Sequence, residues 1–201
     1  MKKTLAALGA VIAAIGGIFL AVGIRPHKDP GLQMACFDSN GAAHYSPTKA
    51  CKAMKEIRWA KSQFPLTVSV MAGAEQVNSG SVKTAVENFN RQLGFGALVL
   101  NQQNASVQLI LDAPSEPGWI DAGGDVRFRR NAAGVLSASM RICNPGDIAT
   151  LHKVLLHEFG HVMGLAHDDF EDSAMWPTIG GERLGLRFTD GDRAILRRLY
   201  K

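Results

Sequence analysis

A pattern of histidines between residues 151 and 167 limits what this chain can fold into more than any other feature of its sequence. His157 and His161 are four residues apart, a spacing that places both side chains on one face of a helix. Asn144 and Pro145 are suited to the first turn of that helix. Apolar residues then recur at helical spacing, at Leu151, Leu155, Phe159 and Val162. We therefore expect the two imidazoles to converge on one point.

The residues that follow this pair complete a candidate metal site. Gly164 has no side chain, so it can end the helix in a left-handed turn and reverse the chain. His167 can then supply a third imidazole nitrogen, and three protein ligands with one open position are what a catalytic zinc ion requires. Glu158 can reach a water on the metal without binding the metal itself. We predict zinc ligands at His157, His161 and His167 and a general base at Glu158.

Two short segments carry a resemblance to a known family. The segment HEFGHVMGLAH, residues 157–167, resembles the extended zinc signature of the metzincins, and SAMWP, residues 173–177, resembles their Met-turn. Within that clan the sequence is most similar to the matrixins, the catalytic domains of matrix metalloproteinases and their bacterial relatives. Met175 falls eight residues after the last histidine, as in the matrixins, and residues 187–200 resemble the C-terminal helix of that family.

This resemblance implies a fold, an activity and further site residues. The implied fold is α+β and metzincin-like: a twisted mixed β-sheet with two long helices, and a small C-terminal subdomain that ends in a helix. The implied activity is that of an exported zinc endopeptidase that hydrolyses peptide bonds of a protein or peptide substrate, which an edge strand would hold by main-chain hydrogen bonds. Met175 would lie beneath the zinc, and Pro177, Thr178 and Ile179 would form the wall of the specificity pocket. We expect a monomer.

One segment departs from the matrixin pattern. Residues 123–130, GGDVRFRR, resemble the matrixin loop that binds a structural zinc and calcium. Arg127 stands at the position of a histidine ligand and Arg129 at that of an acidic one, so we predict that the second zinc is absent. The same changes weaken the case for a structural calcium ion. We expect one catalytic Zn²⁺ as the cofactor.

The first 24 residues differ from the rest of the chain. Two lysines precede an apolar run, residues 5–24, that only glycines interrupt. Ala-Val-Gly at residues 21–23 matches the small-x-small pattern of a cleavage site, which favours a secretory signal peptide at residues 1–23. The run is also long enough to span a bilayer as an uncleaved N-terminal membrane anchor through residues 5–24. Both interpretations place the rest of the chain in a secreted or extracytoplasmic location.

The remaining sequence predicts a linker or extension at residues 24–58 and a matrixin-like peptidase domain at residues 59–201. Three prolines and a mixed polar composition indicate the linker, in which we expect one helical piece near residues 48–58. In the domain we expect a helix at 81–93 and strands at 66–71, 97–100, 107–111 and 134–142. Gly, Pro and Asp at residues 113–131 predict a long surface loop.

Three cysteines fit an exported protein that carries one disulfide. Their pairing cannot be deduced from the sequence. The simplest hypothesis joins Cys36 to Cys51 across a turn-rich stretch and leaves Cys143 over. The alternative is that one cysteine blocks the metal in a latent precursor.

The charge of the chain gives little support to a nucleic-acid partner. Its formal net charge is +4, and loss of Lys2 and Lys3 with the leader would lower that charge to +2. The remaining basic cluster, at residues 127–130, belongs to no nucleic-acid-binding module, so we predict no such partner. Two alternatives to the endopeptidase stay open: a non-catalytic zinc-binding interaction module at the cell surface, and a peptidase that acts on cell-wall crosslinks.

Overall fold

The computed structural model describes residues 33–37, 43–47, 55–71, 79–111, 123–142, 147–168, 170, 173–176 and 185–200. The chain divides into two units, residues 1–30 and 31–201, and the described residues all lie in the second. The predicted leader at residues 1–23 therefore lies outside them. No helix in the described ranges is both long and apolar enough to cross a membrane.

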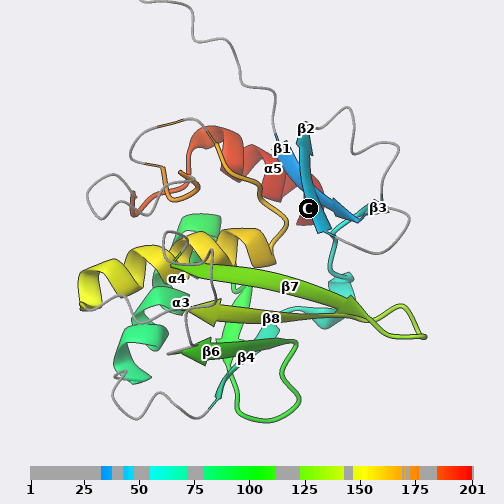
Figure 1. The fold of residues 1–201 in the computed structure, drawn as a ribbon, viewed down its shortest axis with the longest axis horizontal. Coiled ribbons are helices and arrows are strands. Elements are labelled where there is room, and N and C mark those ends of the chain that lie inside the picture. Colours follow the sequence, from blue (N-terminus) through cyan, green and yellow to red (C-terminus); the bar gives the residue numbers. More distant parts are fainter. Residues whose placement is uncertain are drawn as a thin grey trace, which may run out of the picture. The chain divides into compact units, whose positions relative to one another are not determined.

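A five-stranded mixed sheet is the centre of the fold. Its strands are β4 (Leu66–Met71), β5 (Leu98–Leu100), β6 (Val107–Leu111), β7 (Gly124–Arg130) and β8 (Leu136–Ile142). They lie in the order β5-β4-β6-β8-β7. The first four in that order are parallel, and β7 pairs antiparallel with β8 at one edge, as Figure 1 shows. The α+β class and the mixed sheet are confirmed.

Alternate residues of these strands are buried on one face of the sheet. In β6 and β8 the buried side chains pair across the register, Val107 with Ala138 and Leu109 with Met140. Two helices share the same core, α3 (Ser79–Leu93) and α4 (Ile148–Val162), and α4 contacts β7 and β8. Hydrophobic burial on this face fixes the register, because a one-residue slip would expose every apolar side chain of a strand.

Helix α4 begins three residues later than we predicted. Its N-cap is Asp147, whose carboxylate accepts a hydrogen bond from the Thr150 N–H at 2.9 Å. The prediction that Asn144 caps the helix and Pro145 is its first residue is therefore wrong, because Asp147 takes the cap position; Asn144 and Pro145 themselves lie outside the described residues. The predicted end of the helix is confirmed: Gly164 has φ +90°, and the Leu165 N–H returns to the Gly160 carbonyl at 2.9 Å.

The last helix, α5 (Asp190–Tyr200), packs against the end of α4. The Tyr200 hydroxyl donates to the Met163 carbonyl at 2.9 Å, and Trp59 Nε1 donates to the Val162 carbonyl at 2.7 Å. Helix ends leave carbonyls without partners inside the helix, and these two side chains satisfy such groups. The exit from α4 is therefore held by residues from both ends of the predicted domain.

Two predictions about irregular segments are wrong. Residues 124–130 lie within the predicted loop 113–131 but form β7, so Arg127 and Arg129 are strand residues. Before the domain, β1 (Gln33–Phe37), β2 (Ala43–Pro47) and β3 (Lys55–Glu56) form a three-stranded antiparallel sheet in the order β2-β1-β3. Strand β3 replaces the end of the predicted helical piece. The domain boundaries themselves stay a prediction.

Candidate metal centre

Three histidines converge at the end of α4. His157 and His161 come from the helix, and His167 follows the turn at Gly164. Their Nε2 atoms form a triangle with edges of 3.0, 3.2 and 3.2 Å. A tetrahedral zinc ion with bonds of about 2.0–2.1 Å needs ligand atoms about 3.3–3.4 Å apart, so the triangle fits zinc and leaves the fourth position open.

Backbone carbonyls orient two of these rings. His157 Nδ1 lies 2.7 Å from the Ala174 carbonyl oxygen, and His161 Nδ1 lies 2.9 Å from that of Leu165. A carbonyl can only accept, so each Nδ1 carries the proton and donates. In the neutral ring the Nε2 lone pair then points into the triangle, which is the form that binds a metal.

Burial keeps these imidazoles neutral. It lowers the pKa of His157 to about 4, with a smaller effect from His167, and lowers the pKa of His161 well below its ordinary value. The pKa of His167 is also lowered by burial. Because a zinc ligand must be unprotonated, the site is ready to accept the ion at neutral pH.

Glu158 lies beside the triangle with a side chain that is 1% exposed. Burial raises its pKa well above the ordinary value, and the negative charge of Asp125 adds to the effect. Its Oε2 atom has no hydrogen-bond partner among the described residues. A buried carboxyl with a free oxygen and a raised pKa is suited to take and hold a proton.

The start of β7 approaches this carboxyl closely. A Cβ atom built on Gly124 would lie 2.8 Å from Glu158 Oε1 and 2.9 Å from the Arg141 carbonyl oxygen. Real Cβ atoms essentially never come that near, so only glycine fits here without displacement. The start of this edge strand therefore lies against the predicted base.

Comparison with known proteins agrees with this geometry. Residues 112–201, which include all three histidines, match the family model described as Matrixin. The match spans 90 of the 201 residues, slightly less than half of the chain, and makes this segment matrixin-like. A zinc-binding histidine triad is thus expected here, and the chemistry of the donor atoms fits it.

Two matrixin relatives match over short stretches. A putative matrix metalloproteinase of Trichoplusia ni ascovirus 2c is 43% identical over 49 residues, which is 24% of this chain and 10% of the viral protein. The metalloendoproteinase 5-MMP of Arabidopsis thaliana is 26% identical over 91 residues, 45% of this chain and 22% of the plant protein. The chain thus spans less than a quarter of either relative. Among solved structures, archaemetzincin from Methanopyrus kandleri aligns with a TM-score of 0.47 and 16% identity over 66% of this chain and 93% of that one.

In the matrixin segment, the turn at residues 173–176 packs under α4. Met175 is fully buried, and a Cβ atom on Gly160 would overlap its sulfur. Hydrogen bonds hold the turn in place: the Met175 N–H donates to Ser173 Oγ at 2.9 Å, and Ser173 Oγ donates to Asp168 Oδ2 at 2.8 Å. The predicted Met-turn residue thus lies against the helix face between the first two histidines.

Three of these positions were missed by sequence reasoning. The close packing at Gly160 could have been predicted, because a glycine weakens the helix that contains it and its presence there indicates a close neighbour. The roles of Asp168 and Gly124 could not have been predicted from the sequence, since they depend on contacts formed only in the folded chain. The other predicted positions lie outside the described side chains: Pro177, Thr178, Ile179, Cys36, Cys51 and Cys143.

Proposed function

We propose that this chain is a zinc-dependent endopeptidase that hydrolyses peptide bonds in protein substrates. The observation that carries the proposal is the convergence of three neutral imidazoles, 3.0–3.2 Å apart, beside the buried carboxyl of Glu158. Three ligands with an open fourth position are typical of catalytic zinc sites, whereas structural sites use four.

The mechanism assigns one role to each residue of the site. His157, His161 and His167 would hold the ion, which supplies Lewis acidity and lowers the pKa of a water to about 7. Glu158 accepts the proton of the attacking water and returns it to the leaving amine nitrogen. Burial raises the pKa of this carboxyl when no metal is bound, and the positive charge of a bound ion would oppose that shift. The carboxylate can then accept the proton, and the buried acid can return it.

Substrate is proposed to add to the free edge of β7. That strand is paired on one side only among the described strands, so its outward N–H and C=O groups are available to an extended peptide. Gly124 brings this edge to the carboxyl of Glu158. A peptide bound by main-chain hydrogen bonds would therefore lie across the base and the metal. Pro177, Thr178 and Ile179 are proposed as the wall of the pocket that selects its side chain.

Substitution of Glu158 tests the assignment. Glu158→Ala should lower the rate of casein or gelatin cleavage by about 10²- to 10⁴-fold while the protein still binds one zinc per chain. Glu87→Gln is the matched control, because Glu87 is exposed on α3 and forms an ion pair with Lys83 at 3.9 Å, away from the histidines. Cleavage by Glu158→Ala at the native rate would exclude Glu158 as the base. Native protein that binds zinc and cleaves neither protein nor cell wall would instead favour the interaction module.

Export is proposed from the leader. We infer a secreted or extracytoplasmic monomer whose residues 1–23 are removed or retained as an anchor, with Cys36 and Cys51 joined in a disulfide. Mass spectrometry of the protein from culture medium and from membranes would identify its N-terminus. A cytoplasmic protein that begins at Met1, with Cys36 and Cys51 reduced, would contradict the proposal.

A further inference from the structure

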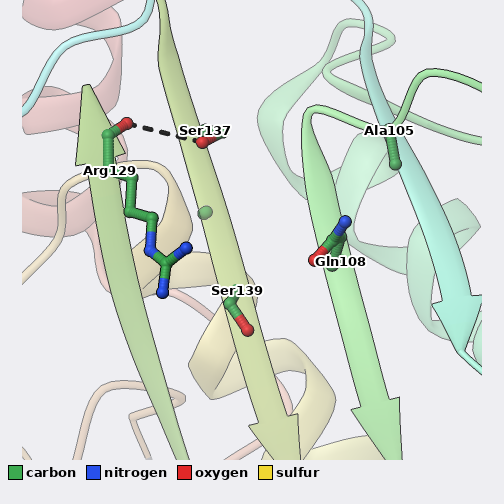
Figure 2. Close-up of a pocket in the computed structure, with 6 residues that line it drawn as sticks. Ala105, Gln108, Arg129, Ser137 and Ser139 are labelled. Carbon is green, nitrogen blue, oxygen red and sulfur yellow. Dashed lines mark hydrogen bonds between the residues drawn. The ribbon is translucent and has the colours of Figure 1, made fainter. Parts of the chain in front are cut away.

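A polar pocket is lined mainly by residues whose side chains lie on the exposed face of the sheet. It has a volume of about 240 Å³ and spans three strands, β6, β8 and β7, as Figure 2 shows. Its lining consists of small or polar residues, Ala105, Gln108, Arg129, Ser137, Ala138 and Ser139. No acidic side chain is among them. The pocket is distinct from the metal centre: neither the histidines nor Glu158 is among its lining residues.

Arg129 gives the pocket a positive charge that nothing in the described part of the chain neutralises. Its neighbours on β7 differ: Arg127 pairs with Asp125 at 2.9 Å, and Arg130 donates to the Gly134 carbonyl at 2.8 Å. On β8, Arg141 lies 3.9 Å from the same aspartate. The Arg129 guanidinium makes no hydrogen bond or ion pair with a described residue, and the side chain leans over the sheet toward β8 (Figure 2).

The other polar groups of the pocket are held in fixed positions by the register of the sheet. Arg129 is paired with Ser137 across β7 and β8, and Ser139 is paired with Gln108 across β8 and β6. A guanidinium, hydroxyl groups and a side-chain amide thus face one small space. The Ser137 hydroxyl donates to the Arg129 backbone carbonyl at 3.5 Å. A planar carboxylate suits the remaining groups, because arginine can bind both of its oxygens while the Ser139 hydroxyl and the Gln108 amide donate to the other lone pairs.

We propose that this pocket binds the carboxylate of an acidic residue in the protein substrate, as a second contact outside the cleft. This inference rests on the proposed peptidase function. The volume is below the roughly 300–1,000 Å³ of sites for drug-sized ligands, which suits one side chain. A polyanion is disfavoured, because its binding requires many unpaired cations along a track and the neighbouring arginines of β7 and β8 already have partners.

The strand β7 connects the pocket to the catalytic site. Gly124 at its start contacts Glu158, and Arg129 lies five residues further along. At about 3.3 Å per residue, the two positions are ~17 Å apart, which is the span of roughly five extended substrate residues. An acidic residue at least that far from the cleaved bond could therefore reach the pocket while the bond lies at the metal.

Paired peptide substrates test this proposal on the zinc-loaded full chain. The two fluorogenic peptides share one cleavable core, and each carries extensions of six residues on both sides that contain either Glu or Gln. Native protein should cleave the Glu peptide with a kcat/KM about 5- to 10-fold higher. Arg129→Gln should reduce that ratio to about one, and Arg129→Lys should keep only part of it, because lysine retains the charge but not the two-pronged geometry.

The matched control is Arg130→Gln, which removes the same charge one residue away and should keep the native ratio. A native ratio of one, or equal losses in the Arg129→Gln and Arg130→Gln variants, would overturn the proposal. So would tight binding of a sulfated polysaccharide that Arg129→Gln does not weaken, since that would identify a polyanion surface.

If native protein cleaves neither peptide, that result contradicts the proposed peptidase function, and the pocket needs a separate test. Binding of the two labelled peptides, measured by fluorescence anisotropy, then tests the pocket with the same variants and the same expected differences.

Discussion

Two glycines determine how closely other residues approach the metal centre. Gly160 lies on α4 between the first two histidines, where a side chain would overlap the Met175 sulfur and come within 3.1 Å of Phe188. Gly124 lies on β7 against the carboxyl of Glu158. Each absent side chain therefore makes room for a group on which the site depends.

We predict that Gly160→Ala destabilises the fold. Alanine should strengthen an isolated helix by about 1 kcal/mol relative to glycine, but overpacking of a tight core costs about 1–3 kcal/mol. Because Met175 is fully buried and cannot move freely, overpacking should prevail and lower the free energy of unfolding by up to about 2 kcal/mol. Urea denaturation of the zinc-free protein would measure it. Gly96→Ala is the control, since nothing lies within 4 Å of its added Cβ. An equal or higher stability for Gly160→Ala would show that Met175 can shift at little cost.

Gly124→Ala should lower both stability and activity. The added Cβ meets the Arg141 carbonyl of β8, which the sheet holds in place, so the start of β7 has to shift, and it also meets the Glu158 carboxyl, which has to move. Misplacement of a catalytic group by about 1 Å can lower a rate by about 10²-fold. We expect kcat to fall at least about tenfold with zinc content unchanged, as measured by peptide hydrolysis and metal analysis. Native kcat in this variant would mean that the base adjusts to the added methyl.

Among the elements, α5 is tied to the segment that carries the third ligand. Thr189 and Asp192 cap the helix reciprocally: the Thr189 N–H donates to Asp192 Oδ2 at 2.9 Å, and the Asp192 N–H donates to Thr189 Oγ1 at 3.1 Å. Burial raises the pKa of Asp192 to about 6, and the nearby carboxyl of Asp168 contributes to the rise. Asp168 directly follows His167, so the two carboxyls join the last helix to the metal site.

This pair predicts a pH-dependent stability difference between native protein and Asp192→Asn. A carboxyl whose pKa is higher in the folded state than its unfolded value of 3.8 stabilises the fold below about pH 4, and that contribution is lost as pH rises through about 6. Asparagine stays neutral and can still accept from Thr189. The variant should therefore gain stability relative to native protein between pH 5 and pH 7.5, by about 1–2 kcal/mol. Urea denaturation across that range would measure the gain, and a difference that stays constant with pH would refute it.

The elements themselves were predictable to different degrees. The strands β6 and β8 alternate apolar and polar residues, because one face is buried, so their positions are confirmed within two residues. Strand β7 has three arginines and lies at the sheet edge, so its own residues resemble a loop and only pairing with β8 makes it a strand. Local spacing likewise revealed the histidines, whereas the contact of Gly124 with Glu158 joins residues 34 positions apart and has no local pattern.

At the scale of the whole molecule, the metal centre depends on contacts from distant parts of the chain. Trp59 and Tyr200 lie near the two ends of the predicted domain, and both bind carbonyls at the end of α4. The added Cβ at Gly164 would lie 3.0 Å from the Ile57 carbonyl, so the turn before His167 is also closely packed. The ligands are therefore held in place by the complete fold, and zinc should stabilise that fold in return.

Removal of zinc with a chelator should lower both the melting temperature and the resistance to acid. A ligand that binds only the folded state stabilises it by RT ln(1 + [L]/Kd), about 4 kcal/mol at a thousandfold excess over Kd, and this term disappears with the metal. In the zinc-free protein the pKa of His157 is about 4 in the folded state, against its ordinary value of 6.5 in the unfolded chain. The stability that this neutral ring contributes is therefore complete above pH 6.5 and is lost as pH falls toward 4. Each such histidine contributes a slope of up to about 1.4 kcal/mol per pH unit. Over pH 7.5 to 5.5 the mean is about half of this limit, because the unfolded pKa lies at the centre of the range. In denaturant titrations with chelator, His157→Gln should therefore have a slope shallower than that of native protein by about 0.7 kcal/mol per pH unit. Identical slopes, or a melting temperature that the chelator leaves unchanged, would show that these imidazoles are not a buried neutral ligand set.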